Sequence, residues 1–208
     1  MKRVPQETID RYLFRPVADS TYNNENIFGN AQPLKIEIGC GNGHFITELA
    51  QEEPDFNFIA IDIKYERVCK TISKLSKRPI DNVRLYHGDA RILLDWYIKN
   101  ESITEFYYNF PDPWPKRKHH KHRLFNSDFL NTLYRVMTPG ALFTCATDHE
   151  EYLQWMLDFL QTDNRFAHIF DDKVVEHISG YHNTLFEKMW REMGKKIYYF
   201  RFIKKQIQ

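Results

Sequence analysis

A single carboxylate stands between two prolines near the middle of the chain, directly before a long basic run. The segment reads Phe110-Pro-Asp-Pro-Trp114, and every residue from 116 to 123 is Lys, Arg or His. Prolines stiffen the backbone around Asp112, and cationic side chains bind the phosphates of a polyanion. A basic run alone is usually a solvated loop. The rigid acidic turn beside it therefore indicates a site that holds a polyanion and contacts one of its bases.

A second feature is a loop in which glycine alternates with other residues. Gly39, Gly41 and Gly43 follow Glu37 at intervals of two. Glycine lets the backbone turn sharply and approach a ligand closely. A nicotinamide site places its third glycine one residue later, where this chain has His44, and needs helix-start amides for its pyrophosphate. The loop therefore favours a ligand without phosphate, such as S-adenosylmethionine.

Three acids stand at the ends of the first three expected strands, where an open parallel sheet binds its ligands. Glu37 can reach the ammonium of S-adenosylmethionine, Asp62 both ribose hydroxyls, and Asp89 the adenine amino group. Each has a simpler explanation: Glu37 can satisfy local amides, Asp89 can cap the helix that follows, and the loop can be a tight turn. The combination of the loop with all three acids predicts a methyl-donor site.

Apolar runs of strand length alternate with segments of helical periodicity. We expect strands at 34–38, 56–63, 83–86, 103–110 and 141–146, and helices at 45–50, 68–75, 90–98, 125–137 and 152–160. Such alternation predicts an open parallel sheet with helices on both faces. The tail differs, because expected strands at 166–175 and 197–203 flank a helical stretch at 184–193. It predicts a closing pair with antiparallel character.

Length and charge bound the possible organisation. The 208 residues predict one domain, with an N-terminal arm at 1–30 and a catalytic core at 31–208. We expect the arm to gain part of its order from a partner. The formal net charge is +1, so the five Lys and Arg of residues 116–123 leave −4 for the remainder by subtraction. Positive charge is therefore focused in one segment, which can steer a polyanion.

The composition indicates an intracellular protein. Cys40, Cys69 and Cys145 are odd in number and widely spaced, which fits a reducing compartment and gives no metal-binding spacing. No apolar run reaches about 18 residues, and the N-terminus lacks an apolar signal segment. We therefore expect a cytoplasmic protein that binds no metal and no membrane. The sequence does not distinguish a monomer from a homodimer.

The glycine loop and the segment Phe110-Pro-Asp-Pro-Trp-Pro-Lys116 together resemble the bacterial tRNA (guanine-N7-)-methyltransferases of the TrmB family. Two more signatures support the resemblance, Ala146-Thr-Asp-His-Glu150 and Thr184-x-Phe-Glu187 with Gly194 downstream. The resemblance covers about residues 26–203. The Pro-Asp-Pro-Trp segment is specific, whereas many methyltransferases share the glycine loop. The family implies an α/β, Rossmann-like class I S-adenosylmethionine-dependent methyltransferase fold, with a mostly parallel seven-stranded sheet and an antiparallel C-terminal strand.

The resemblance also implies residue roles. Asp112 matches both a donor contact and the proposed catalytic position, while Asp62 stands where Glu is more frequent. The donor-binding positions are Glu37, Gly39, Gly41, Gly43, Asp62, Asp89 and Asp112. The substrate-binding positions are Lys116, Asp148, Thr184, Leu185, Phe186 and Glu187. The RNA-contacting positions are Lys118, His119, His120, Lys121, His122 and Arg123. That segment is often richer in arginine, so its histidines predict a pH-dependent RNA affinity.

The implied reaction moves the methyl group of S-adenosylmethionine to N7 of the variable-loop guanine 46 of tRNA, leaving S-adenosylhomocysteine. Alternatives remain for single residues: Thr184 and Glu187 can form a capping box, Asp148 can cap a helix, and Trp114 can pack against the sheet instead of stacking on a base. Two other functions also remain, a small-molecule methyltransferase with a basic lid and a non-catalytic RNA-binding subunit. The basic run weighs against the first and the intact acids against the second.

Overall fold

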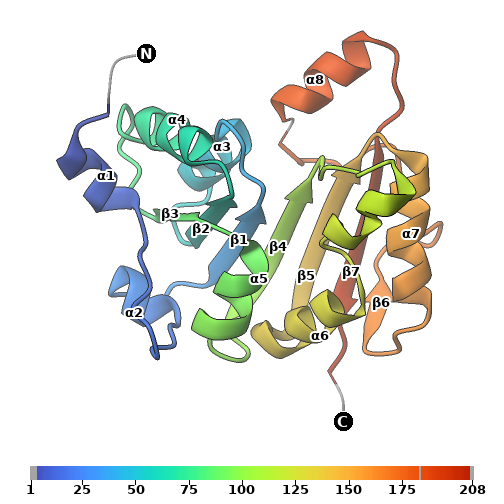
Figure 1. The fold of residues 1–208 in the computed structure, drawn as a ribbon, viewed down its shortest axis with the longest axis horizontal. Coiled ribbons are helices and arrows are strands. Elements are labelled where there is room, and N and C mark those ends of the chain that lie inside the picture. The colour runs from blue at the N-terminus through green and yellow to red at the C-terminus, as the bar shows by residue number, and fades with distance from the viewer. Residues whose placement is uncertain (1–3, 183, 207–208) are drawn as a thin grey trace.

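Seven strands form one mixed sheet in the computed structural model, which describes residues 4–182 and 184–206 (Figure 1). The strand order is β3-β2-β1-β4-β5-β7-β6. Strands β1 to β5 pair in parallel, and β7 is antiparallel to both of its neighbours. The strands are β1 (Leu34–Ile38), β2 (Asn57–Asp62), β3 (Val83–His87), β4 (Ile103–Asn109), β5 (Met137–Thr147), β6 (Phe166–His168) and β7 (Tyr198–Lys204). The predicted class I methyltransferase architecture, with its antiparallel C-terminal pairing, is confirmed.

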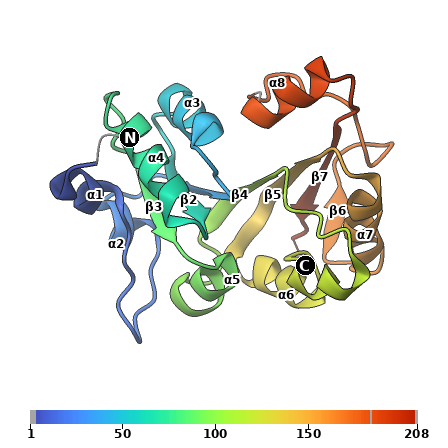
Figure 2. The same cartoon turned by 45° about the horizontal axis from the view of Figure 1, so that its top comes forward.

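Helices cover both faces of the sheet, as Figure 2 shows with α3 and α4 on one side and α5, α6 and α7 on the other. The helices are α1 (Gln6–Tyr12), α2 (Asn24–Phe28), α3 (His44–Glu52), α4 (Tyr65–Leu75), α5 (Ala90–Ile92), α6 (Ser127–Val136), α7 (Glu150–Gln161) and α8 (Leu185–Glu192). A π-helical turn, η1 (Leu93–Tyr97), continues α5, and a 3-10 helix, η2 (Arg117–His122), precedes α6. Helix α8 extends beyond the edge at which the parallel strands end (Figure 1).

Alternation along each strand divides the core between the two faces. In β2, Phe58 and Ala60 pack with α1, α3 and α4, whereas Ile59 and Ile61 pack with the opposite helices. Every residue of β2 is buried, as expected for a central parallel strand with helices on both sides. The same alternation turns Glu37 of β1 toward α3, because its neighbours Ile36 and Ile38 belong to the opposite cluster.

Three elements differ from the expected ranges. The helix expected at 90–98 is α5 followed by the π-helical turn. Strand β5 begins at Met137 instead of residue 141, so it includes Pro139 and Gly140. These two residues lie where the register of β5 with β4 shifts, and such an irregularity tolerates proline. Strand β6 has only 3 residues, and Val175 adds an isolated bridge to Tyr199.

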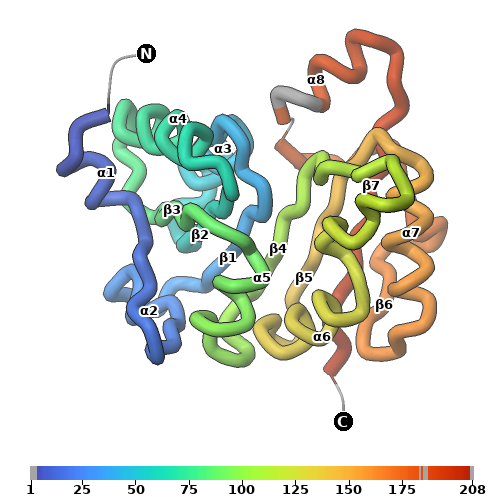
Figure 3. Tube along the Cα trace, viewed as in Figure 1, coloured from blue at the N-terminus to red at the C-terminus, as the bar shows by residue number. Residues whose placement is uncertain are grey.

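The N-terminal segment from residue 4 is folded against the body of the protein, so the expectation that it needs a partner for its order is wrong. Helix α1 packs on α4 and β3, which Figure 3 shows as dark blue tube beside them. Tyr12 is 1% exposed and donates its hydroxyl to the Ile80 carbonyl at 2.9 Å. Arg11 and Arg15 form ion pairs with Asp81 and Asp10. These pairs reduce the basic character that the sequence gives this segment.

Across residues 4–182 and 184–206, no helix combines the length and apolar character needed to cross a membrane.

Candidate active site

The glycine loop joins β1 to α3, and its glycines serve two different purposes, close packing of helices and open space beside the backbone. Gly39, Gly41 and Gly43 have φ angles of 80°, 57° and 71°, in the left-handed region. A Cβ atom on Gly43 would lie 2.4 Å from Cγ2 of Thr71, so this glycine permits α3 and α4 to pack closely. A Cβ atom on Gly39 or Gly41 would meet nothing within 4 Å. The backbone at these two positions therefore faces open space that a ligand can fill.

Asp62, the last residue of β2, fixes the glycine loop. Its two carboxylate oxygens accept hydrogen bonds from the backbone N–H of Gly41 at 2.9 Å and of Lys64 at 2.8 Å. Arg67 lies 3.7 Å away. Each carboxylate oxygen has a second lone pair. The residue can therefore accept further hydrogen bonds from the ribose hydroxyls of a bound nucleoside while it holds the loop.

Glu37 is a buried acid with an unsatisfied oxygen. Its residue is 2% exposed, and Oε2 has no hydrogen-bond partner among the described residues. Burial raises the pKa of Glu37 to about 8, the Asn109 amide opposes that rise, and the Asp62 carboxylate adds to it. A buried carboxyl group of this kind either stays protonated or is stabilised as an anion by a cationic donor. An ammonium group next to the open backbone of Gly39 would be such a donor, so these residues suit the amino-acid end of S-adenosylmethionine.

Asp89 follows β3 and already has local partners. Its carboxylate caps α5 through the backbone N–H of Arg91 at 2.9 Å and also pairs with the Arg91 guanidinium at 2.6 Å. Hydrogen bonds from Arg91 lower the pKa of Asp89. The helix-cap alternative is therefore confirmed, and a contact between Asp89 and adenine remains a prediction.

Asp112 lies in a turn immediately after β4. Phe110 and Trp114 have φ angles of 49° and 44°, which are uncommon for residues other than glycine and occur often at functional sites. The Asp112 carboxylate accepts a hydrogen bond from the backbone N–H of Trp114 at 3.1 Å, and the residue is exposed. The Phe110 N–H donates to the Ala146 carbonyl at 2.8 Å, which ties the turn to β5. Asp112 is thus presented to solvent at the edge where Glu37 and Asp62 lie.

The basic segment forms η2, which appears in yellow-green beside α7 in Figure 1. Lys116, Lys118, Lys121 and His122 are exposed, whereas His119 and His120 are half-buried. Trp114 packs against the histidines, with ring centroids 5.0 Å from His122 and 5.9 Å from His119. His120 contacts the Trp155 ring at 5.4 Å. The lysines are therefore free to meet phosphates, while His119 and His120 also have packing roles.

Asp148 follows β5 at the carboxyl edge of the sheet, and α8 extends beyond the same edge. Asp148 pairs with Lys195 Nζ at 2.9 Å, and His149 caps α7 by accepting from the Tyr152 N–H at 3.3 Å. The alternative in which Asp148 is the cap is therefore wrong.

At α8, Thr184 Oγ1 accepts from the Glu187 N–H at 3.0 Å, so the capping alternative for Thr184 is confirmed. Glu187 is 1% exposed and pairs with Arg191 at 2.9 Å, so a base can reach it only after a local rearrangement. The side chains of Leu185 and Phe186 lie outside the described part of the structure.

Comparison with known proteins decides the family. The family described as "Putative methyltransferase" matches residues 31–200. A tRNA (guanine-N(7)-)-methyltransferase of Chlamydia caviae is 35% identical over 181 residues, which are 87% of this chain and 80% of that protein. The chain belongs to the tRNA (guanine-N7-)-methyltransferase family. A relative of the same name from Geobacter metallireducens is 36% identical over 180 residues, 86% of this chain and 85% of that protein.

Solved structures agree on the fold. The 16S rRNA methyltransferase KamB superposes with a TM-score of 0.62 at 14% identity, covering 88% of this chain and 92% of that one. A 16S rRNA (adenine(1408)-N(1))-methyltransferase from Catenulisporales acidiphilia, solved with its cosubstrate SAM, gives 0.58 at 15% identity, covering 86% and 89%. These likenesses establish the fold of this member of the tRNA (guanine-N7-)-methyltransferase family and nothing finer.

One predicted RNA contact of this family member needs correction. The Arg123 side chain is 0% exposed, and its guanidinium pairs with both Glu151 oxygens at 2.6 and 3.0 Å. It also lies 4.9 Å from the ring centroids of Tyr152 and Trp155. A guanidinium enclosed in this way cannot meet an RNA phosphate. Arg123 therefore anchors the end of the basic segment to α7.

Two residues next to the candidate site, Asn109 and Tyr181, did not stand out in the sequence. Asn109, at the end of β4, is 9% exposed and accepts a hydrogen bond from the Tyr181 hydroxyl at 2.6 Å. Only the alternation of β4 could have indicated Asn109. Alternate residues of a strand share a face, so Asn109 lies on the face of Tyr107, which is the register partner of Glu37.

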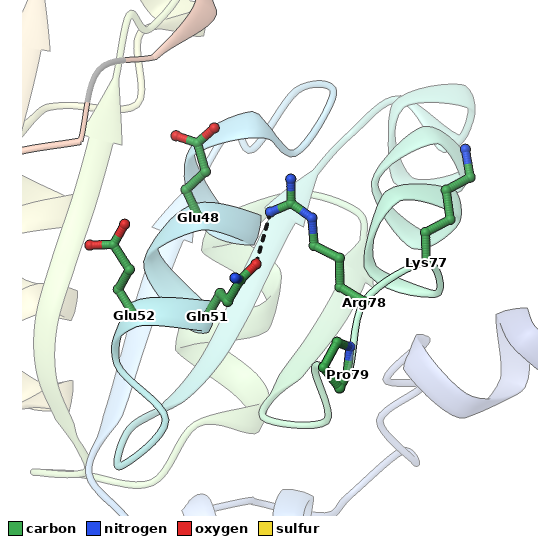
Figure 4. Close-up of a pocket in the computed structure, with 6 residues that line it drawn as sticks. All are labelled: Glu48, Gln51, Glu52, Lys77, Arg78 and Pro79. Carbon is green, nitrogen blue, oxygen red and sulfur yellow. Dashed lines mark hydrogen bonds between the residues drawn. The ribbon is translucent and has the colours of Figure 1, made fainter.

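A surface depression of about 430 Å³ lies elsewhere, between the last turns of α3 and the end of α4 (Figure 4). Charged and polar side chains line it, and Arg78 donates to Gln51 at 3.2 Å across it. The glycine loop lies at the opposite end of α3, so this depression is separate from the family's active site.

Proposed function

We propose that this protein transfers the methyl group of S-adenosylmethionine to N7 of a guanine in tRNA, with guanine 46 of the variable loop as the target. One arrangement carries the proposal: the buried, unsatisfied Glu37 carboxylate beside open glycine backbone shares a sheet edge with Asp112 and the exposed lysines of η2. This combination joins a site for a cationic nucleoside to a surface for a polyanion. Membership of the tRNA (guanine-N7-)-methyltransferase family supports the same substrate pair, and we expect the protein to meet that substrate in the cytoplasm.

The donor supplies an electrophilic methyl group on a sulfonium. In this proposal Glu37 binds its ammonium, Asp62 its ribose hydroxyls and Asp89 its adenine amino group. The φ-positive backbone at Gly39 and Gly41, where a Cβ atom would meet nothing within 4 Å, leaves room for the ligand to lie against the loop. In this proposal the chain's own groups therefore hold the donor at both ends, at the sheet edge that also carries Asp112.

Guanine N7 has an in-plane lone pair and carries no proton, so the reaction needs no general base. A carbon–nitrogen bond forms at N7 while the carbon–sulfur bond breaks, and its electron pair stays on sulfur. Positive charge moves from sulfur to the purine, and the Asp112 carboxylate stabilises that charge on both. Holding the two reactants in line can itself lower the barrier by about 7–11 kcal/mol at the upper end.

Recognition of guanine is assigned to Asp148, Glu187 and Thr184. The two acids accept hydrogen bonds from N1–H and from the 2-amino group, which adenine does not present together. To bind guanine, Asp148 must either release its ion pair with Lys195 or accept from both partners, and the same holds for Glu187 and its ion pair with Arg191. Lys116, Lys118 and Lys121 bind the phosphates around the target base, which leaves its stack to enter the site.

Transfer of radiolabelled methyl to unmodified tRNA, followed by nucleoside mapping, tests this proposal. We expect 7-methylguanosine at position 46, and no label when that guanine is replaced by adenine. Label on a small acceptor with none on RNA would favour a small-molecule methyltransferase with a basic lid. Binding of tRNA without methyl transfer to any acceptor would favour a non-catalytic RNA-binding subunit.

A further inference from the structure

A hydrogen-bonded pair connects the segment after β6 with the buried acid of the donor site. The Tyr181 hydroxyl donates to Asn109 Oδ1 at 2.6 Å. This contact joins residues 72 apart in the sequence and crosses the carboxyl edge of the sheet, from the segment that leads into α8 to the last residue of β4. In this contact the oxygen of the Asn109 amide faces Tyr181.

The other end of that amide faces the donor site. Asn109 and Glu37 lie on the same face of neighbouring strands, since Glu37 is in register with Tyr107, two residues before Asn109. Asn109 Nδ2 and Glu37 Oε2 are both buried, and neither has a hydrogen-bond partner among the described residues. Asn109 Nδ2 is a donor and Glu37 Oε2 is an acceptor. If the Asn109 amide were reversed, its oxygen would face the Glu37 carboxylate, and two acceptors would meet.

We propose, on the basis of the donor site proposed above, that Tyr181 and Asn109 are positioning residues that orient and hold Glu37 for the ammonium of S-adenosylmethionine. Tyr181 fixes the Asn109 amide by occupying its oxygen. The amide NH₂ then faces the Glu37 carboxylate and favours its anionic form. The remaining lone pairs of that carboxylate stay available to the ammonium.

The groups around Glu37 agree with this assignment. Its environment includes Asp62 from β2, Cys40 from the glycine loop and Tyr181. Asp62 is an acid, whose charge disfavours a second anion nearby. The Asn109 amide acts in the opposite direction and lowers the pKa of Glu37 against the larger effect of burial. Without this amide the pKa of Glu37 would lie higher still, and the carboxyl group would lose its proton less readily when the donor binds.

Packing permits a clean test of the hydroxyl. The Tyr181 ring lies 5.3 Å from Phe45 and 5.4 Å from Tyr199, so Tyr181→Phe keeps the ring contacts and removes only the hydrogen bond. Tyr12→Phe is a matched control, because it also removes a buried hydroxyl that donates at 2.9 Å, but at the far edge of the sheet.

Calorimetric titration with S-adenosylmethionine at several pH values tests the proposal. We expect Tyr181→Phe to weaken donor binding about tenfold, the effect of one buried hydrogen bond of roughly 1.4 kcal/mol. The pH at which binding reaches half its maximum should also rise, and the Kd for tRNA should stay unchanged. Asn109→Ala should show the same shift, and Tyr12→Phe should show neither change.

Two outcomes would overturn the proposal, and they differ from each other. If the wild-type protein binds S-adenosylmethionine and Tyr181→Phe binds it equally well with the same pH profile, the positioning role is refuted while the proposed function stands. If the wild-type protein does not bind S-adenosylmethionine at all, the proposed function fails and the positioning role fails with it.

Discussion

Arg123 donates from Nε to the carbonyl oxygen of Pro113 at 2.9 Å and thereby holds the residue next to Asp112. The same guanidinium is paired with Glu151 on α7, the helix that begins just after Asp148. The two acids proposed to surround the purine, Asp112 and Asp148, thus lie next to elements that the buried Arg123 guanidinium joins. The turn that carries Asp112 is therefore held to α7 by Arg123, in addition to the bond from the Phe110 N–H that ties it to β5.

The buried position of Arg123 predicts a loss of stability when it is replaced. Arg123→Met removes two charge-assisted hydrogen bonds and one to a carbonyl, and should lower the free energy of unfolding by about 2–4 kcal/mol. Arg117→Met, at an exposed position of the same segment, should change it by less than about 0.5 kcal/mol. Urea denaturation measures both. Equal effects from the two variants would mean that Arg123 is not an anchor.

The exposed lysines of η2 should determine the salt dependence of tRNA binding. Each lysine that neutralises one RNA phosphate contributes about 0.7–0.9 to the slope of log K against log salt. The double variant Lys118→Ala, Lys121→Ala should therefore bind tRNA more weakly and with a flatter slope. Lys77→Ala, on the distant depression of Figure 4, should leave the slope unchanged. A slope that stays steep in the double variant would place the phosphates on another surface.

The sequence was sufficient for the sheet because local signals repeat along it. The alternation of apolar runs with helical segments, and the glycines after Glu37, depend on neighbours within a few residues. The role of Arg123 depends instead on Glu151 and Trp155, which lie on α7, beyond both α6 and β5. In a run of cations it is indistinguishable from Lys121, which is exposed. The contact of Tyr181 with Asn109 joins an irregular segment to the end of β4 over 72 residues, and no periodic pattern predicts such a contact.

The burial of Glu37 predicts a cost to stability that depends on pH. Its pKa is raised to about 8 in the folded protein, so its contribution to stability is full below the unfolded pKa and is lost as pH rises through about 8. Glu37→Gln lacks this dependence. At pH 9 it should be more stable than the wild-type protein, by an amount on the order of 3–5 kcal/mol, and at pH 4 the two should be nearly equal.

Thermal unfolding across this pH range measures the effect of Glu37→Gln at each pH against the wild-type protein. Glu25→Gln, exposed on α2, serves as the control and should follow the wild-type curve. The Glu37 variant should also lose affinity for S-adenosylmethionine. A Glu37→Gln protein that is less stable than the wild type at pH 9 would contradict the assignment of an uncompensated buried carboxylate.

At Asp112 the effect of the negative charge can be tested separately from the effect of the hydrogen bond that holds the turn. Its carboxylate oxygen accepts from the Trp114 N–H, and the amide oxygen of asparagine can accept the same hydrogen bond. Asp112→Asn should therefore keep the turn, the stability and the Kd for tRNA. It should lower kcat by about 100-fold or more, because a negative charge beside the methyl group stabilises the transition state, at roughly 2.7–4 kcal/mol for one such group. Single-turnover methyl transfer with tRNA in excess measures this step directly. Unchanged turnover would show that the charge of Asp112 is dispensable, whereas a parallel loss of tRNA binding would make Asp112 an RNA anchor.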